Sequence, residues 1–148
     1  MIFQIERLGF EELSAFLRLQ AEDSFPDLKE EERLNLLAEK WSKYAECSTC
    51  RNDDGHLIGM IAFYANAQGV EFAYIPHVYV SPKYRCKGIF SCMLEMVEKY
   101  TKEKGFFEIR LEVDKQNKRA QQSYQCNGFD IMPSQNPDIQ SFYMSKKI

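Results

Sequence analysis

The clearest hydrophobic pattern of the chain begins at Ile89, where apolar residues recur at intervals of three and four positions as far as Tyr100. This spacing places one apolar stripe along a helix of about four turns, and Gly105 is suited to end it. After the helix the period changes to two, which is typical of a strand with one buried face. The apolar residues predicted on that face are Phe107, Ile109, Leu111 and Val113. With a strand before Ile89, the segment forms a β-α-β crossover whose two strands are parallel.

Shorter signals predict the remaining elements. Three glutamates, 30–32, favour a helix start, residues 52–55 read as a hairpin turn, and Asn127-Gly128 is typical of a helix end. The first strand of the crossover is predicted over 70–80. The predicted elements outside the crossover are a strand over 3–8, helices over 10–23 and 30–45, a hairpin over 46–65, a helix over 117–126 and a strand over 140–146. The order of elements predicts an α/β fold.

Length and charge limit the classes of protein that fit. With 148 residues, 45% of them hydrophobic, the chain is suited to a single domain over residues 1–148. The net charge of −3 disfavours a nucleic-acid-binding protein, which usually has a basic face. Residues 1–46 hold eleven acidic and six basic residues, a balance of −5, whereas residues 47–148 have a balance of +2. The two portions are therefore expected to face differently charged partners.

The sequence has only weak signals for a targeting segment, a membrane span or a metal-binding site. The first residues lack a basic region before an apolar run, and no segment approaches 18 consecutive apolar residues, so we expect a cytoplasmic protein that does not span a membrane. Five cysteines, an odd number, fit a reducing compartment better than a disulfide framework. Cys47 and Cys50 form a Cys-x-x-Cys pair, but no second pair follows and His56 and His77 lack ligand spacing. Two cysteines in an ordinary strand are the favoured interpretation, and no metal is expected.

The most informative stretch for function is Arg85-Cys86-Lys87-Gly88-Ile89-Phe90. It lies between a predicted strand and the amphipathic helix that begins at Ile89. A basic, glycine-containing turn that opens a helix points successive N–H groups and the positive end of the helix dipole at one place. The stretch therefore predicts a phosphate-binding loop.

Two motifs together resemble a known family. The motifs are Val78-Tyr79-Val80-Ser81-Pro82-Lys83-Tyr84-Arg85-Cys86-Lys87-Gly88-Ile89 and, about thirty residues later, Asn117-Lys118-Arg119-Ala120 with Tyr124-Gln125-Cys126-Asn127-Gly128-Phe129. Over roughly residues 70–132 they look like the acetyl-CoA core of the GNAT superfamily of N-acetyltransferases. The resemblance implies a central twisted, mixed β-sheet that splays open between two strands and is flanked by about four helices. It also implies acetyl-CoA as cosubstrate and no metal.

The resemblance assigns a cofactor site as well. The backbone of Val78, Tyr79 and Val80 would pair with the pantetheine arm as a short pseudo-strand. The N–H groups that would surround the pyrophosphate belong to Arg85, Cys86, Lys87, Gly88, Ile89, Phe90 and Ser91, with side-chain charge added by Lys83, Arg85 and Lys87. Asn117 would bond a pantetheine or carbonyl group, and its alternative role is only to cap the last helix.

For the chemistry, the resemblance places Tyr124 where it donates to the departing thiolate, while the N–H of Val78 polarises the thioester carbonyl. The alternative for Tyr124 is a core aromatic on an amphipathic helix. Both assignments concern acetyl transfer by direct attack of an amine in a ternary complex.

The base that deprotonates the amine does not follow from the two motifs. Many members of the family carry a glutamate on the strand before the loop, but residues 72–77 contain no carboxylate. His77 is the natural substitute, and a structural histidine is the alternative. Glu71, or a water chain ending on Tyr74 or Tyr79, could serve instead. Because the carboxylate base of the family is missing from this strand, a non-catalytic acyl-CoA-binding sensor or regulatory module stays the alternative function.

The acceptor is expected to be a primary amine, on a small molecule or a peptide. The negative balance of residues 1–46 would attract a cationic amine such as a polyamine or an aminoglycoside-like compound, although a solvated acidic helix start explains the same residues. A protein N-terminus or lysine is the other option. Homodimers are common in the family, so a homodimer is among the expectations.

Overall fold

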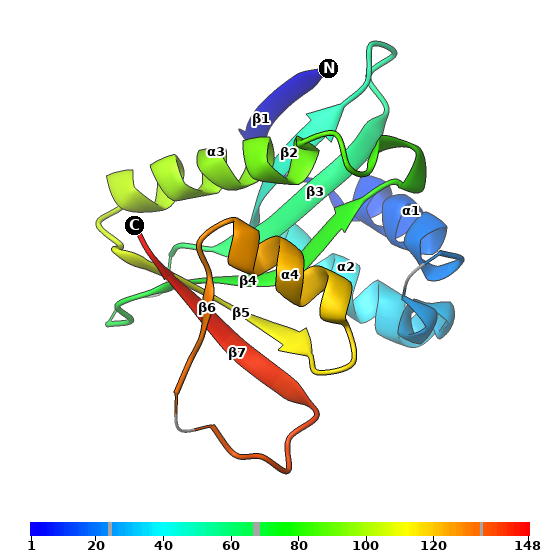
Figure 1. The fold of residues 1–148 in the computed structure, drawn as a ribbon. Coiled ribbons are helices and arrows are strands. Elements are labelled where there is room, and N and C mark those ends of the chain that lie inside the picture. Colours follow the sequence, from blue (N-terminus) through cyan, green and yellow to red (C-terminus); the bar gives the residue numbers. More distant parts are fainter. Residues whose placement is uncertain (24, 67–68, 134) are drawn as a thin grey trace.

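A computed structural model describes residues 1–23, 25–66, 69–133 and 135–148. Within these residues a seven-stranded sheet lies between two pairs of helices (Figure 1). Its strands are ordered β1-β2-β3-β4-β5-β7-β6, and all neighbours are antiparallel except β4 and β5. The mixed sheet and the parallel central pair confirm the predicted fold class.

The strands are β1 (Ile2–Glu6), β2 (Glu46–Arg51), β3 (Leu57–Tyr64), β4 (Ala73–Val80), β5 (Glu108–Asp114), β6 (Asp130–Ile131) and β7 (Ser141–Lys147). The helices are α1 (Phe10–Ala21), α2 (Glu31–Tyr44), α3 (Ile89–Glu103) and α4 (Lys118–Cys126), with short 3-10 turns η1 (Pro26–Lys29) and η2 (Pro82–Tyr84). Each predicted element is present with ends shifted by a few residues. The short strand β6 was not predicted, because two residues are too few for a periodic pattern.

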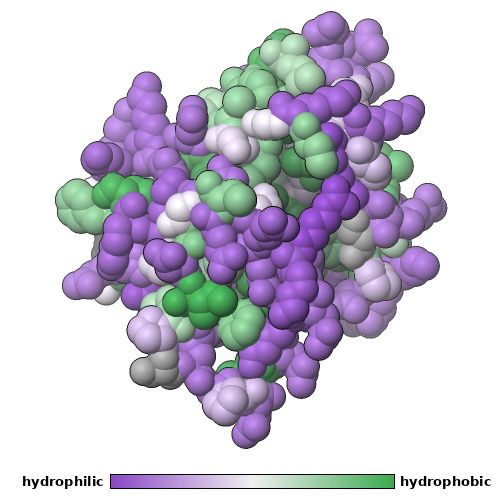
Figure 2. Space-filling model, in the orientation of Figure 1, coloured by the Kyte–Doolittle hydropathy of each residue, from purple (hydrophilic) through white to green (hydrophobic). Residues whose placement is uncertain are grey.

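Each face of the sheet has its own hydrophobic core. Helices α3 and α4 lie over the face in front in Figure 1, and α1 and α2 lie behind it. The front core includes Ile61, Phe63, Met93, Val97, Leu111 and Met144, and the rear core includes Leu13, Leu17, Leu34, Trp41, Met60 and Ala62. Strand β3 supplies residues to both cores, which explains why its sequence is continuously apolar. The outer surface over α3 and α4 is largely hydrophilic, with hydrophobic patches between the polar side chains (Figure 2).

The start of β5 differs from the predicted alternation. Phe107 precedes the strand and is 64% exposed, whereas Glu108 is buried. The Glu108 carboxylate accepts hydrogen bonds from Arg110, Ser145 and Lys147, which compensate its loss of hydration. The prediction of Phe107 on the buried face was therefore wrong, because the strand begins only at Glu108. The prediction of Glu108 on the polar face was wrong because its ion pairs with Arg110 and Lys147 allow it to be buried.

A β-bulge in β4 decides which side chains face which helices. Tyr74 pairs with Tyr64 and His77 with Ala62, so β4 has one residue more than β3 between these pairs. Before the bulge, Ile75 packs in the front core, and after it Val78 does the same. The bulge therefore turns His77 toward the rear layer of α1 and α2.

In the described ranges no helix combines the length and the apolar content that crossing a membrane requires.

Candidate active site at the fork of the sheet

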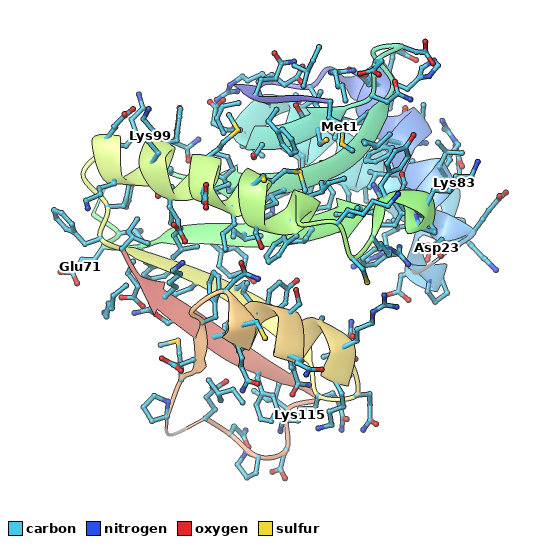
Figure 3. All side chains as sticks on the ribbon, turned by 45° about the horizontal axis from the view of Figure 1, so that its top comes forward. Met1, Asp23, Glu71, Lys83, Lys99 and Lys115 are labelled. Carbon is cyan, nitrogen blue, oxygen red and sulfur yellow. The ribbon has the colours of Figure 1, made fainter. Side chains whose placement is uncertain are left out.

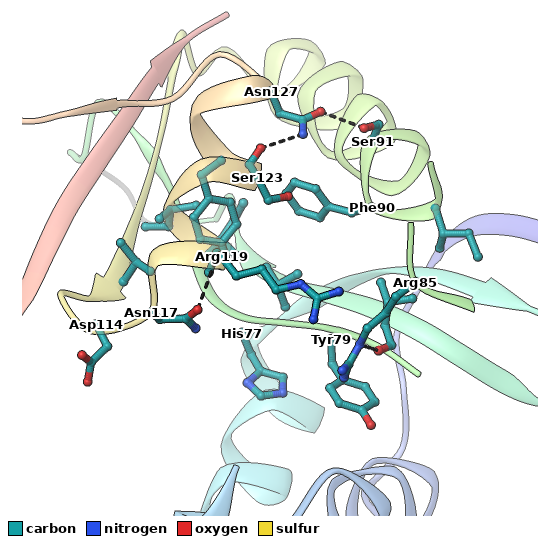
Figure 4. A pocket seen from close by; sticks show the side chains of 18 of the residues that line it. His77, Tyr79, Arg85, Phe90, Ser91, Asp114, Asn117, Arg119, Ser123 and Asn127 are labelled. Atoms are coloured by element: carbon teal, nitrogen blue, oxygen red, sulfur yellow. Dashed lines mark hydrogen bonds between the residues drawn. The ribbon is translucent and has the colours of Figure 1, made fainter. Parts of the chain in front are cut away.

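The sheet divides where the parallel pairing of β4 and β5 stops. Only three residue pairs join these strands, and the last is Ile75 with Leu111. Pro76 follows at once, and a proline has no N–H to donate to a neighbouring strand. Beyond this point β4 stays paired with β3, and β5 with β7. A cleft of about 730 Å³ lies in the fork and is lined by residues of β4, β5, η2, α3 and α4 (Figure 4).

The free peptide groups of β4 face this cleft. The N–H of Ser81 donates to the carbonyl of Ile58 on β3, at 2.8 Å. Because successive residues of a strand direct their peptide groups to opposite edges, Val78 and Val80 direct theirs toward the gap. The carbonyl of Val80 accordingly accepts a hydrogen bond from the Arg85 side chain, at 2.8 Å. The fork therefore leaves an unpaired edge of β4, with which an extended, amide-bearing ligand can form hydrogen bonds.

The turn before α3 presents a row of open N–H donors. In the described part of the chain, the N–H groups of residues 86–91 bond no backbone acceptor, whereas that of Arg85 bonds the carbonyl of Pro82 at 3.3 Å. Cys86 and Gly88 both have left-handed backbone, with φ of 62° and 79°. No heavy atom lies within 4 Å of a Cβ built on Gly88, so space is left beside the turn. Open donors at the start of a 15-residue helix are chemically suited to an anion.

The side chain of Arg85 is engaged inside the protein. Its guanidinium forms an ion pair with Asp23, which follows α1, and lies 5.4 Å from the centre of the Tyr79 ring. The Tyr79 hydroxyl donates to the same carboxylate at 3.0 Å, and burial together with Asp23 raises the pKa of Tyr79 to about 12. Figure 3 shows Asp23 beside the turn that carries Lys83. The triad therefore ties the end of α1 to the loop before α3.

Arg119, which was quoted in the motif but not assigned a role, lies across the cleft from this triad. Its guanidinium contacts the sulfur of Cys86 at 3.7 Å and extends from α4 toward Arg85 (Figure 4). Among the described residues, no carboxylate lies within ion-pair distance of Arg119. Lys87, by contrast, lies over the ring of Tyr84 at 5.8 Å. Arg119 is therefore well suited to contact an anion in the cleft.

Helix α4 brings Asn117 and Tyr124 to the cleft. The side chain of Asn117 accepts a hydrogen bond from the N–H of Ala120 at 3.1 Å, so it caps the helix while lining the cleft. Tyr124 packs edge-on against Phe90 and Phe129, with ring centres 5.6 and 6.0 Å away. Its hydroxyl makes no hydrogen bond to another described residue, and burial raises its pKa to about 12. Tyr124 therefore keeps its proton and has it available for a ligand.

The start of α3 is also fixed to α4 by polar contacts. The Ser91 hydroxyl donates to the amide oxygen of Asn127 at 2.8 Å, and the amide nitrogen of Asn127 donates to the carbonyl of Ser123 at 2.8 Å. Of these two bonds, drawn in Figure 4, the first joins the start of α3 to the end of α4, and the second holds the Asn127 side chain on its own helix end.

His77 lies at the rear of the cleft in a nearly closed environment. Its Nε2 is 2.5 Å from the amide oxygen of Gln20, and its ring centre is 4.8 Å from Phe25 and 4.9 Å from Trp41. Figure 4 shows the ring directed toward α1 and α2. Burial lowers the pKa of His77 to about 4, so the ring is neutral at pH 7. Its assignment as the base stays a prediction.

Two carboxylates on β5, Glu112 and Asp114, also line the cleft. Sequence reasoning placed both on the solvent face of a strand without assigning a function. The only sequence signal at these two positions was the two-residue alternation, which predicts exposure. It could not predict that they line a cleft, because the fork depends on where β5 stops pairing with β4.

The Cys-x-x-Cys pair lies apart from the cleft. Cys47 and Cys50 are buried in β2 without a disulfide, and burial raises the pKa of Cys47 to about 12. No group of three or more histidine, cysteine or acidic residues able to hold a metal occurs in the ranges that the structure describes.

Together, the forked mixed sheet and the open helix start at its mouth define a protein of the acyltransferase type. The family model described as "Acetyltransferase (GNAT) family" matches residues 11–129, and the chain belongs to this family. The resemblance that the two motifs indicated is thereby confirmed.

A curated protein and several solved structures are also similar to the chain. A spermidine N(1)-acetyltransferase from Thermoplasma acidophilum is 35% identical over 94 residues, which cover 64% of this chain and 55% of that protein. The match thus spans about half the length of this curated relative. The crystal structure of a PaiA N-acetyltransferase from Thermoplasma acidophilum in complex with coenzyme A is 24% identical with a TM-score of 0.71, and covers 100% of both chains. A GNAT-family acetyltransferase from Streptococcus pneumoniae is 20% identical with a TM-score of 0.71, over 99% of this chain and 100% of that one.

Proposed function

We propose that the protein transfers an acetyl group from acetyl-CoA to a primary amine, by direct attack of the amine in a ternary complex. The single observation that carries the proposal is the fork between β4 and β5, which has an open row of N–H donors at its mouth. A thioester with an amide-bearing arm and a diphosphate matches both features at once. The coenzyme A complex of the Thermoplasma PaiA protein, which shares the fold, supports the same assignment.

In this proposal the diphosphate lies against the N–H groups of residues 86–91, where Gly88 leaves space for close approach. Arg119 supplies the side-chain charge from α4. The pantetheine arm then follows β4 inward along Val78 and Val80, and the amide of Asn117 contacts it from the opposite wall.

At the inner end, the N–H of Val78 stabilises the charge that develops on the thioester oxygen. The leaving thiolate receives a hydrogen bond from Tyr124. Because burial raises the pKa of this phenol to about 12, well above the value near 8.5 of an ordinary thiol, hydrogen bonding is favoured over complete proton transfer. Tyr124 therefore stabilises the leaving group while remaining a phenol.

The acceptor in this proposal is a cationic amine. The acidic balance of residues 1–46, which include α1 and α2, favours positively charged molecules near these helices. The Thermoplasma relative is a spermidine acetyltransferase, which makes a polyamine the first acceptor to try.

The test measures thiol release from acetyl-CoA with spermidine, an aminoglycoside, a lysine-containing peptide and a peptide with a free N-terminus, and identifies products by mass spectrometry. We expect amine-dependent thiol release and a product heavier by one acetyl group for at least one acceptor. An acetyl-CoA-dependent rise in melting temperature without any amine-dependent release would instead indicate the acyl-CoA-binding sensor.

A further inference from the structure

We propose that the acceptor amine also carries a carboxylate, which binds Arg110 in a second pocket on the rear face of the sheet. The proposal rests on the proposed function and narrows its acceptor to an amine with an apolar body and one anionic group. It follows from where this second pocket lies, which groups line it, and which N–H donors of Arg110 have no partner.

The second pocket, of about 380 Å³, lies over the rear side of three neighbouring strands. Tyr74 from β4, Arg110 from β5 and Tyr143 from β7 line it. The residues before and after each of them along its strand pack in the front core, so alternation places all three on the rear face. Among the described residues, the rear core of α1 and α2 contains none from β5 or β7. This part of the sheet is therefore available to a ligand.

The second pocket begins where the fork ends. Tyr74 is paired with Arg110, one position before the last pair that joins β4 to β5. Glu112, which lines the cleft, follows two residues after Arg110 on the same face, roughly 7 Å farther along the strand. A molecule whose amine reaches the fork from the rear can therefore place its other end in the second pocket.

Aromatic and aliphatic groups form most of the pocket wall. Phe72 precedes β4, and Met132, Pro133 and Gln135 belong to the segment between β6 and β7. The Gln135 side chain attaches this segment to β7. Its amide oxygen accepts from the N–H of Tyr143 at 2.6 Å, and its amide nitrogen donates to the carbonyl of the same residue at 2.9 Å. The wall is thus preformed and suited to an apolar group.

Arg110 alone is charged among the described residues that line the second pocket. Its guanidinium lies over the Phe72 ring, 3.9 Å from the ring centre, which orients it. Its Nε donates to Glu108 at 2.6 Å and its Nη2 to the same carboxylate at 3.4 Å, whereas in the described ranges its Nη1 donates to no acceptor. The guanidinium therefore retains N–H donors for a carboxylate, which matches its planar shape.

The positive charge at this position is only partly balanced. Glu108 forms ion pairs with Arg110 at 2.6 Å and with Lys147 at 2.9 Å. One carboxylate thus faces two cations, and the three side chains together carry one positive charge. The side chain of Arg110 is 31% exposed, so water screens its charge less than that of a fully solvated arginine. A carboxylate in the second pocket would complete the pairing.

An acceptor that fits both sites has opposite charges at its two ends. The acidic balance of residues 1–46 favours its ammonium group, and Arg110 favours its carboxylate. An amino acid with an aromatic or aliphatic body is such a molecule. A polyamine is cationic at both ends, so its far end would meet Arg110 with like charge and it should be acetylated more slowly.

The experiment compares two pairs of amines whose members differ in the carboxylate. The pairs are phenylalanine with phenethylamine, and 4-(aminomethyl)benzoate with benzylamine. With wild type and acetyl-CoA, kcat/KM should be at least about tenfold higher for the acid in one pair or both. Arg110→Gln should abolish most of this ratio. Lys147→Gln removes the other cation of Glu108, outside the second pocket, and should preserve the ratio.

Equal or faster acetylation of the neutral amine in both pairs, or an unchanged ratio in Arg110→Gln, would overturn the proposal. Because Arg110→Gln leaves Glu108 with one cation fewer, a melting curve with coenzyme A shows whether each variant folds. If Arg110→Gln does not fold, Arg110→Lys keeps the charge but loses the planar fork, and it should still lower the ratio. An unchanged ratio in a folded Arg110→Lys variant would then count against the proposal.

Binding of 3-phenylpropionate separates this proposal from the proposed function, because the probe has no amine to acetylate. Calorimetric titration into the wild-type protein saturated with coenzyme A should show saturable binding that Arg110→Gln weakens by about tenfold or more. Absence of binding to wild type would overturn the assignment of the second pocket. Binding without amine-dependent thiol release for any amine would instead refute the proposed function and leave the anion site of Arg110 intact.

Discussion

Arg85 and Asp23 form an ion pair across the mouth of the cleft, although they lie 62 positions apart in the chain. Arg85 comes from the loop that precedes α3, and Asp23 from the segment that follows α1. The pair therefore links the layer of α1 and α2 to the loop before α3, which is proposed to bind the diphosphate. It also means that the charge of Arg85 is largely balanced by a carboxylate.

The first prediction concerns the two arginines of the cleft. Arg119→Gln should weaken coenzyme A binding by about tenfold, because its guanidinium has no carboxylate partner among the described residues and can contact a phosphate. Arg85→Gln should have a smaller effect, because Asp23 already balances that charge. Isothermal titration of both variants at one salt concentration checks the order, and a larger loss for Arg85→Gln would contradict it.

Removal of the Tyr124 hydroxyl should affect the chemical step alone. In Tyr124→Phe the ring contacts with Phe90 and Phe129 are kept, so the free energy of unfolding should change by less than about 1 kcal/mol. The loss of a donor to the thiolate should lower kcat by roughly 10- to 100-fold. Steady-state kinetics and coenzyme A titration measure both effects, and wild-type kcat would remove Tyr124 from catalysis.

The buried neutral His77 should make stability depend on pH. Its pKa is lowered by burial from an ordinary value of 6.5 to about 4, so the unfolded chain binds more protons between these values. The stabilisation is complete above about pH 6.5 and is lost as the pH falls toward 4. His77→Gln should flatten the decline of melting temperature over this range, and an equally steep decline would show that His77 is not its cause.

Glu108 should contribute stability that is lost at lower pH. Its hydrogen bond with Arg110 is the main cause that lowers its pKa from 4.5 to about 2. A carboxylate with a lowered pKa stabilises the fold above its unfolded pKa, and this contribution is lost as the pH falls from about 5 toward 2. At pH 7, Glu108→Gln should reduce the free energy of unfolding by roughly 2 kcal/mol. Chemical denaturation at pH 7 and pH 3 tests this, since the difference should shrink in acid.

The sequence by itself determined the helices and strands and the glycine-containing loop before α3. Three- and four-residue spacing fixed α3, two-residue alternation fixed β5, and Gly88 marked the turn where open N–H groups precede a helix. These features are local, because helix and strand periods and the conformational freedom of glycine act over a few residues. For the same reason, the two motifs were sufficient to indicate the family.

Only the tertiary structure decided which distant groups meet. The bulge at Pro76 turned His77 into the layer of α1 and α2, and the end of β4–β5 pairing opened the cleft beside Glu112. The contact of Asp23 with Arg85 likewise depends on how α1 packs behind the sheet. The physical reason is that strand register and helix packing are set by burial summed over both cores, which no local pattern records.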